Sequence, residues 1–328
     1  MKVLIAVHHR VDAWTIPASH VDELRTRFPH ITFSHSASRE SDIELGMDAD
    51  AAFALALSTE AVAQAKQLRW LHCSGHAVGH FPLGELAARG VTVTNSRGIQ
   101  AVPIAEHVMA CLLALARKLP HTLRDQQERA WRPNALTGEA SPWLLAKRTL
   151  GVIGVGTLGQ AIGVRAAAFG MRVIGMRRSP ARGLPAGFGE VMGPADRDRL
   201  LAAADVVVLA APLTTETHRL LDAAAIAAMK PGAILINVAR GELIDEAALA
   251  EALESGRIGG AALDVFAKEP LPSDSPLWSL PNVIVTPHIA GEPAGYAERV
   301  VSQVFADNLA RFRGGQPLQN VVDLARGY

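Results

Sequence analysis

The chain has 328 residues, more than one hydrophobic core usually supports, so two domains are expected. Hydrophobic residues make up 49% and charged residues 20%, which is typical of a soluble globular enzyme. Lys plus Arg and Asp plus Glu each total 32, so the net charge does not indicate binding to a nucleic acid or to an anionic membrane. We expect neither kind of partner.

Cysteine content and the start of the chain point to a cytoplasmic protein. The two cysteines, Cys73 and Cys111, are too few for a metal quartet or a disulfide framework. The apolar run Val3–Val7 stops at His8, which makes it too short for a signal peptide and predicts a first strand. No apolar run approaches the length of a membrane span.

The segment before Asn95 alternates short apolar runs with helical stretches, which predicts a parallel sheet with helices between its strands. A long helix that is apolar on nearly all sides follows at Ala101–Arg117, and such a helix is usually buried between layers or domains. The strands expected before it are Val3–Val7, Ile31–His35, Ala51–Leu57, Leu68–His72 and Val91–Thr94, and the helices are Val21–Phe28, Glu60–Gln64 and Pro82–Arg89.

A second alternation of strands and helices begins at Thr149. Its expected strands are Leu150–Gly154, Arg172–Met176, Val206–Ala210, Ala233–Asn237, Gly260–Asp264 and Val283–Thr286. Its expected helices are one that ends at Phe169, then Asp222–Met229 and Glu246–Ser255, with a last amphipathic helix at Glu298–Arg313. The fold class is therefore α/β, with two doubly wound, Rossmann-like parallel-sheet domains and a cleft between them.

A glycine-rich run joins the first strand of this second series to its helix: Gly154-Val-Gly156-Thr157-Leu158-Gly159. The first glycine permits a tight turn, the second lets a pyrophosphate approach the backbone, and the third lets helix and strand pack closely. The helix amino terminus then faces the phosphate charge. Alone, such a run is often only structural, but its place between strand and helix predicts a dinucleotide site.

The end of the next strand indicates which dinucleotide is preferred. An NAD site usually carries an acid there, about 20 residues after the glycines, whereas this chain has Arg177, Arg178 and Ser179. Two guanidinium groups and a hydroxyl suit the 2′-phosphate of NADP. NADP is therefore favoured, and NAD bound beside a solvated basic turn is the alternative.

Three runs near strand ends carry groups suited to hydride transfer with a 2-oxo acid: Asn237-Val-Ala-Arg240-Gly241, Asp264-Val-Phe-Ala-Lys-Glu269-Pro270 and Thr286-Pro287-His288. Arg240 offers a permanently charged fork for the substrate carboxylate. His288 can give a proton to the forming alkoxide, and Glu269 can orient its imidazole. Each residue alone also has a purely structural explanation: Arg240 as part of a surface ion pair, Glu269 as a loop carboxylate and His288 as a structural histidine.

Taken together, these runs resemble the D-isomer-specific 2-hydroxyacid dehydrogenases from about Val91 to the end of the chain. The resemblance also rests on Thr94–Ile99, Pro103–His107 and Pro212–Thr217. It implies a discontinuous substrate domain at 1–99 plus 289–328, with a cofactor domain at 100–288 inserted between its parts. It also implies a homodimer built largely on the cofactor domains.

The resemblance implies further site residues. Asp264 would contact the nicotinamide carboxamide, although a strand-end turn residue is the milder reading. Other cofactor contacts would come from Pro212, Thr217, Val238, Ala239 and Gly291. Substrate would meet Arg240, His288 and the loop residues Gly75, His76 and Ala77.

The loop near Ser74 departs from the family pattern of glycine, hydrophobic residue and acid, since Ala77 and Gly79 replace the glycine and the acid. Backbone N–H groups at His76 and Ala77 can still cradle a carboxylate. His72, His76 and His80 follow one another at a spacing of four, but no acid or cysteine joins them, so we expect no metal site.

The ending Val321–Tyr328 looks like that of some glyoxylate/hydroxypyruvate reductases. Together with the two arginines, it favours reduction of a small 2-oxo acid. Larger 2-oxo acids such as phenylpyruvate are an alternative, and a non-catalytic protein that senses NAD(P) is another. A formate dehydrogenase is disfavoured because that family pairs the histidine with Gln, whereas this chain has Glu269.

Overall fold

The computed structural model describes residues 1–9, 15–181, 183–291 and 295–327. The chain forms two compact units, which are described separately. Met1–Ile99 with Glu292–Tyr328 is called the amino-terminal unit, and Gln100–Gly291 is called the central unit. The boundaries predicted for the two domains were 99/100 and 288/289, and those of the units are 99/100 and 291/292.

The amino-terminal unit is built on a five-stranded parallel sheet with the order β2-β1-β3-β4-β5. Its strands are β1 (Lys2–Ala6), β2 (Thr32–His35), β3 (Ala51–Ala54), β4 (Trp70–Cys73) and β5 (Thr92–Asn95). Its helices are α1 (Ala18–Arg27), α2 (Arg39–Gly46), α3 (Thr59–Gln64), α4 (Leu83–Ala88), α11 (Tyr296–Arg299), a π-helical stretch at Val300–Phe305, and α12 (Ala306–Arg313).

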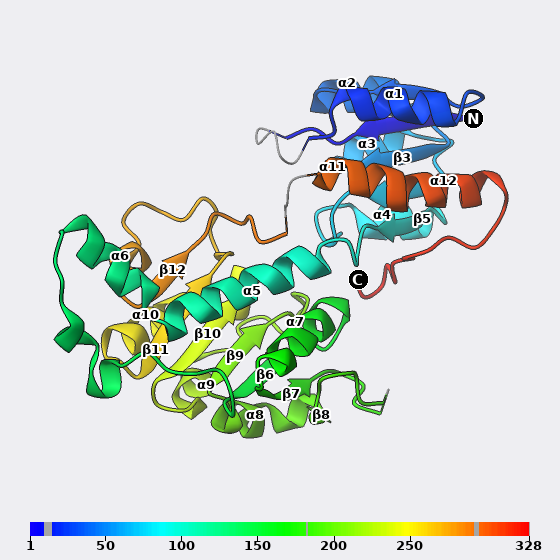
Figure 1. Ribbon diagram of the computed structural model, residues 1–328. Helices are drawn as coiled ribbons and strands as arrows, with labels where there is room; N and C mark the ends of the chain where they lie inside the picture. Colours follow the sequence, from blue (N-terminus) through cyan, green and yellow to red (C-terminus); the bar gives the residue numbers. More distant parts are fainter. Residues whose placement is uncertain (10–14, 182, 292–294, 328) are drawn as a thin grey trace. The chain divides into compact units, whose positions relative to one another are not determined.

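Helices cover both faces of this sheet. Helix α1 packs on one face together with the carboxy-terminal helices, and α2, α3 and α4 pack on the other (Figure 1). Strands covered on both sides are apolar along their whole length, and every residue of β3 and β4 is buried. Because all five strands run parallel, their carboxyl ends lie along the same edge of the sheet.

The predicted single helix Glu298–Arg313 is interrupted. Val300–Phe305 is π-helical and lies between α11 and α12. A π turn inserts a residue into the helical repeat and so shifts which side chains face the core. Here Phe305 is fully buried, and its ring stacks on those of Phe53 and Trp70 at centroid distances of 4.4 and 5.5 Å.

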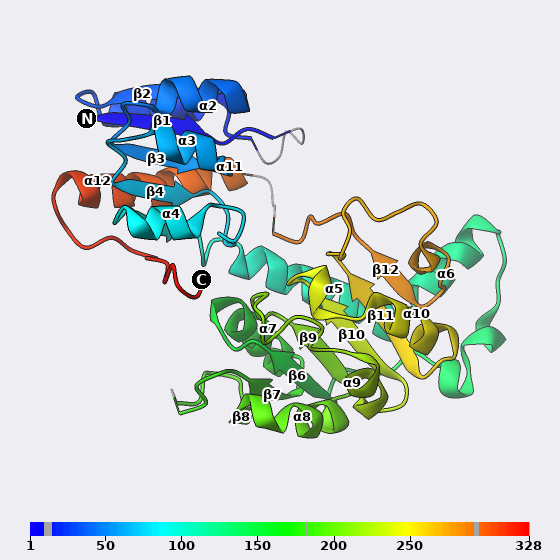
Figure 2. The same ribbon diagram turned by 180° about the vertical axis from the view of Figure 1, so that it is seen from behind.

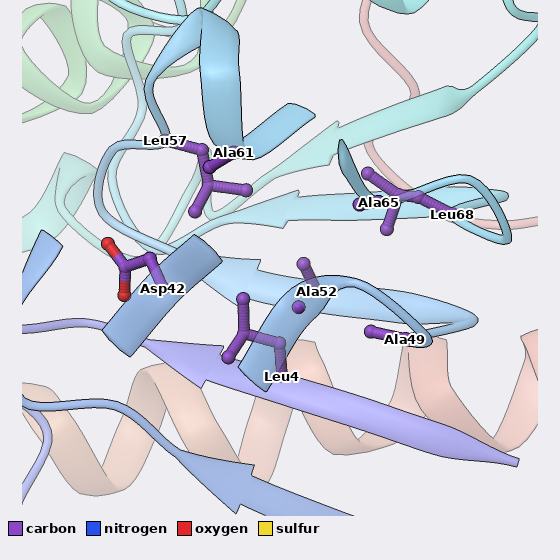
Figure 3. Close-up of a pocket in the computed structure, with 9 residues that line it drawn as sticks. Leu4, Asp42, Ala49, Ala52, Leu57, Ala61, Ala65 and Leu68 are labelled. Carbon is purple, nitrogen blue, oxygen red and sulfur yellow. The ribbon is translucent and has the colours of Figure 1, made fainter. Parts of the chain in front are cut away.

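A small cavity lies in the core between β1, β3 and the helices α2 and α3 (Figure 3). The volume open to a water-sized molecule is about 10 Å³, which holds at most about one water. Asp42 lies at one end of it, and its two carboxylate oxygens are 3.0 and 3.1 Å from His8 Nε2. The cavity is too small for an organic ligand.

The central unit contains a seven-stranded parallel sheet with the order β12-β11-β10-β9-β6-β7-β8. Its strands are β6 (Thr149–Ile153), β7 (Arg172–Met176), β8 (Glu190–Met192), β9 (Val206–Leu209), β10 (Ala233–Asn237), β11 (Ile258–Leu263) and β12 (Val283–Val285). Its helices are α5 (Ala101–Ala116), α6 (Leu119–Gln127), α7 (Thr157–Ala168), α8 (Arg197–Ala203), α9 (Ala223–Ala228) and α10 (Glu246–Glu254).

Two helical layers sandwich the sheet of the central unit. The apolar helix α5 packs with α7 on one face, and α8, α9 and α10 cover the other (Figure 2). From β6 the chain adds β7 and β8 on one side of the sheet and then β9 to β12 on the other, so the topological switch point lies between β6 and β9. In open α/β sheets, ligands bind beyond the carboxyl ends of the strands at such a point. The predicted fold class, two doubly wound parallel sheets with alternating helices, is confirmed.

In the described part of the chain, no helix combines the length and the apolar character that crossing a bilayer requires.

Candidate functional site

The glycine turn lies at the topological switch point of the central unit. Gly154 follows β6 with φ 104°, and a Cβ there would lie 2.4 Å from Ala211 N, just after β9. A Cβ on Gly159 would lie 2.1 Å from Gly154 O, whereas one on Gly156 would have no atom of the described residues within 4 Å. Helix α7 begins at Thr157, directly after Gly156. The turn therefore closes tightly at its ends and leaves the space at its middle glycine open, as a pyrophosphate site requires.

The basic turn after β7 holds its two arginines differently. Arg177 Nη2 donates to Pro180 O at 3.3 Å and also to Gly183 O, while its Nε is buried and has no hydrogen-bond partner among the described residues. Arg178 and Ser179 are exposed. The Arg177 guanidinium thus stabilises the turn itself, while the Arg178 side chain is exposed to solvent.

The loop after β9 is shaped by the Thr217 hydroxyl. Thr217 Oγ1 donates to Pro212 O at 2.7 Å and accepts from Thr214 N at 2.8 Å. Hydrogen bonds to Thr214 are the main cause that lowers the pKa of Glu216, and the positive charge of Arg178 also contributes.

The turn that carries Arg240 is formed by the side chain of Asn237. This residue is fully buried at the end of β10, where its Nδ2 donates to Arg240 O at 2.8 Å and its Oδ1 accepts from Ala239 N at 3.0 Å. Arg240 Nη1 donates to Ala239 O at 2.5 Å. Burial lowers the pKa of Arg240 from its ordinary value, and the charges of Glu269 and Glu242 oppose that shift. An arginine remains a cation at neutral pH despite such a shift.

Glu269 and His288, from separate runs of the sequence, meet in the central unit. His288 Nδ1 lies 2.8 Å from Glu269 Oε2, and both side chains are about one-third exposed, at 37% and 36%. Glu269 Oε1 also accepts from Phe266 N at 3.0 Å. Desolvation raises the pKa of Glu269, but the hydrogen bonds from His288 and Phe266 and the charges of His288 and Arg240 outweigh it, so the pKa is lowered. The carboxylate is therefore ionised throughout the neutral range.

The backbone of His288 has φ 56°, which is uncommon for a residue other than glycine. Buried Asp264, directly after β11, holds the turn in this conformation. Its Oδ1 accepts from Thr286 Oγ1 at 2.6 Å and from Ile289 N at 3.0 Å, and its Oδ2 accepts from Ala290 N at 3.0 Å. The strand-end role considered for Asp264 is thus visible, and its contact with a carboxamide stays a prediction.

These three side chains supply complementary chemistry within one unit. Arg240 is a partly buried planar cation, His288 can exchange a proton, and Glu269 is an anion bonded to one nitrogen of the imidazole. Such a set can bind a carboxylate and protonate an oxygen that gains negative charge. Three residues predicted to contact the cofactor are buried and close in sequence to the catalytic candidates. Val238 and Ala239 directly precede Arg240, and Gly291 follows shortly after His288.

The loop after β4, in the amino-terminal unit, turns its carbonyl groups toward other parts of that unit. Ser74 O accepts from Tyr296 Oη at 2.8 Å, Gly75 O from Ser96 N at 3.0 Å, and His76 O from Asn95 Nδ2 at 2.6 Å. In a trans peptide the N–H points opposite to the C=O. The N–H groups of Gly75, His76 and Ala77 therefore point away from these partners.

Two of the three histidines at a spacing of four, His72 and His80, lie in different surroundings and make different hydrogen bonds. His72 is fully buried on β4, with Nδ1 2.7 Å from Thr94 Oγ1 and Nε2 3.1 Å from Ser96 Oγ, and burial lowers its pKa to about 3. His80 Nε2 lies 2.6 Å from Leu55 O. Among the residues that the structure describes, no group of three His, Cys, Asp or Glu side chains is arranged to hold a metal ion.

Sequence reasoning missed residues that act by shaping the backbone. Asn237 forms the Arg240 turn and Thr286 bonds Asp264 behind His288. Both lie within the runs that predicted the site, and a buried polar residue at a strand end is a signal for such a role, because it must find partners.

Comparison with known proteins identifies relatives of the chain. The model of the D-isomer specific 2-hydroxyacid dehydrogenase family, NAD binding domain, matches residues 109–290. A glyoxylate reductase of Korarchaeum cryptofilum is 34% identical over 295 residues, which cover 87% of this chain and 86% of that protein.

A D-3-phosphoglycerate dehydrogenase of Archaeoglobus fulgidus is 35% identical over 268 residues, which cover 82% of this chain and 50% of that protein. The chain thus spans about half the length of the first curated relatives that it matches. Among solved structures, a D-isomer specific 2-hydroxyacid dehydrogenase from Xanthobacter autotrophicus Py2, in complex with NADPH and MES, has a TM-score of 0.81. It is 31% identical, and the match covers 100% of this chain and 99% of that one.

Proposed function

The chain belongs to the D-isomer specific 2-hydroxyacid dehydrogenase family, and we propose that it reduces a small 2-oxo acid, glyoxylate or hydroxypyruvate, with NADPH. The observation that carries the proposal is the 2.8 Å contact between His288 Nδ1 and Glu269 Oε2 in the unit that also holds Arg240. A proton donor, its orienting carboxylate and a fixed cation are what reduction of a 2-oxo acid requires.

Each residue has one role in the proposed mechanism. Arg240 binds the substrate carboxylate and polarises the carbonyl through its planar fork. His288 gives a proton to the carbonyl oxygen from Nε2, because Nδ1 is bonded to Glu269. Glu269 holds the imidazole in this orientation. A reduced dinucleotide held by the Gly154–Gly159 turn would supply the hydride for this reduction.

The central unit has the features that a dinucleotide phosphate needs. The Gly154–Gly159 turn offers open space at Gly156 and the amino terminus of a 12-residue helix. Arg178 presents a guanidinium beside Ser179, and Arg177 supports the turn that carries them. These groups support NADP over NAD. The relative from Xanthobacter autotrophicus Py2, solved with NADPH, supports the same assignment.

The substrate is proposed to be small because of the similarity to a glyoxylate reductase, and the loop after β4 is proposed to bind its carboxylate. The curated glyoxylate reductase aligns along 86% of its length with this chain. In the loop after β4, the N–H groups of His76 and Ala77 are oriented to bind a carboxylate, because the carbonyls of Gly75 and His76 are turned the other way. We therefore assign this loop to substrate binding.

Isotope transfer tests the proposed reaction. We expect hydroxypyruvate and NADPH carrying deuterium in the transferable position to give D-glycerate with one deuterium at C2, measured by chiral chromatography and mass spectrometry. Hydroxypyruvate is chosen because its product is chiral, whereas glycolate is not. Unlabelled glycerate, or the L isomer, would refute direct hydride transfer of the proposed stereochemistry.

We further propose that two copies of the chain associate through the central unit. Large apolar side chains are exposed in and after α6, with Trp131 at 93%, Leu144 at 70% and Leu123 at 56%, and exposed apolar clusters mark interaction surfaces. One chain has a mass of 34.8 kDa. Light scattering during gel filtration should therefore give about twice this mass.

The double variant Trp131→Ser, Leu144→Ser should lower the measured mass toward that of a single chain. The matched control is Trp278→Ser, because Trp278 is also exposed, at 54%, but lies outside this segment. A wild-type mass of one chain, or a double variant that stays dimeric, would contradict the assignment of this surface.

A further inference from the structure

The backbone of the loop that carries Glu269 is in close contact with the backbone of the turn that carries Arg240. A Cβ on Gly241 would lie 1.9 Å from Phe266 C and 2.1 Å from Ala267 N. Real Cβ atoms do not approach so closely, so only glycine lets the two backbones meet here. The positions of Arg240 and Glu269 are thus coupled through a direct backbone contact.

Glu246 holds the same loop from its other side. It is the first residue of α10, and its Oε1 accepts from Ala267 N at 2.6 Å. The preceding amide, Phe266 N, donates to Glu269 Oε1 at 3.0 Å. Two successive amides of one loop are therefore bound by two carboxylates, one of which contacts His288.

The surroundings of Glu246 are unfavourable to a charged carboxylate. Burial raises its pKa, the negative charges of Glu242 and Glu269 add to this, and the hydrogen bond from Ala267 N opposes it. Glu246 lines an open pocket of about 230 Å³ together with His218, Arg219, Glu242 and Asp245. A half-buried acid beside other acids is costly, and the bond to the loop amide offsets part of that cost.

We propose that Glu246 is a positioning residue of the catalytic group, because its carboxylate binds Ala267 N–H and so fixes the Glu269 loop against the Arg240 turn. This rests on the proposed function for its kinetic consequence. Glu246 does not touch the substrate. It keeps Glu269 Oε2 at hydrogen-bond distance from His288 Nδ1, so that the imidazole stays oriented.

Three variants separate the hydrogen bond from the charge. Glu246→Ala removes both, and Glu246→Gln keeps an oxygen acceptor but removes the charge. Glu242→Gln is the matched control, because Glu242 lines the same pocket and its charge acts on both Arg240 and Glu246. The net contribution of one hydrogen bond corresponds to a change of about tenfold. We therefore expect Glu246→Ala to lower kcat/KM for 2-oxo acid reduction about tenfold.

The pH profile distinguishes positioning from a general loss of stability. In the reduction direction His288 must carry the proton. With Glu269 displaced, the alkaline limb of kcat/KM should move to lower pH by about half a unit in Glu246→Ala, and stay near the wild-type position in Glu246→Gln and Glu242→Gln. A variant that is only less stable would lose active protein without moving this limb.

A second readout needs neither cofactor nor turnover. The imidazole signal of His288 is followed by NMR against pH in the free protein and identified by its loss in His288→Gln, since the chain has 12 histidines. Glu246→Ala should shift this titration in the same direction as the kinetic limb. Failure of the wild type to reduce any 2-oxo acid would count against the proposed function alone, because the NMR titration still tests the positioning role.

The proposal is overturned if Glu246→Ala leaves both the titration and the limb at their wild-type positions. It is equally overturned if Glu242→Gln or Glu246→Gln shifts them as far as Glu246→Ala does, since the charge rather than the bond would then be responsible.

Discussion

Replacing His288 with alanine is expected to lower the turnover of 2-oxo acid reduction by about two to four decades, the usual effect of removing a general acid. The affinity for NADPH should change little, because the Gly154–Gly159 turn and the basic turn after β7 lie elsewhere in the central unit. Steady-state rates and a fluorescence titration with NADPH measure the two quantities separately.

Glu269→Gln is the companion to His288→Ala, because it keeps a hydrogen-bonding group 2.8 Å from His288 Nδ1 but removes the negative charge. Its turnover should fall less than that of His288→Ala, since the proton donor is still present. If His288→Ala kept turnover within a few-fold of the wild type, His288 would not be the proton donor.

The second large effect is expected from Arg178→Asp, which should raise the KM for NADPH by about one to two decades, as expected for the loss of charge-assisted hydrogen bonds. The KM for NADH should stay nearly constant, because NADH has no 2′-phosphate. Initial rates with each cofactor at saturating 2-oxo acid measure the ratio.

Arg177→Asp tests how the two arginines differ. The Arg177 guanidinium donates to carbonyl groups of Pro180 and Gly183, so its loss should disturb the whole turn and weaken NADPH binding as well. Arg172→Asp is the control, because Arg172 is also exposed but lies at the start of β7, at the opposite end of the strand from the basic turn, and this change should affect neither cofactor. Equal loss of NADPH and NADH in Arg178→Asp would refute the phosphate contact.

Strongly patterned strands were predictable from the sequence. Arg172–Met176 and Ala233–Asn237 have the predicted bounds, because buried parallel strands are continuous apolar runs ended by polar residues. Helix α2 was missed, since only Asp42 and Gly46 are buried on it and the apolar periodicity is absent. Strand β8 has only three residues at the edge of its sheet, too few to produce a pattern.

The site was predictable where chemistry alone selects the residue type. Glu269 and His288 were chosen as an orienting acid and a proton donor, and the structure places them 2.8 Å apart; their roles stay predictions. Gly241 and Glu246 could not be found in this way. Their contacts depend on which loop of the folded chain, more than 20 residues away, comes to lie against them.

The most direct test of the whole account is the initial rate of absorbance change at the reduced-nicotinamide band. Glyoxylate, hydroxypyruvate, pyruvate and phenylpyruvate are each tested with NADPH and with NADH. The account predicts oxidation of NADPH with glyoxylate or hydroxypyruvate, faster than with phenylpyruvate and faster than the same reaction with NADH. Binding of NADPH without turnover of any of the four acids would contradict it and would favour a protein that senses the cofactor.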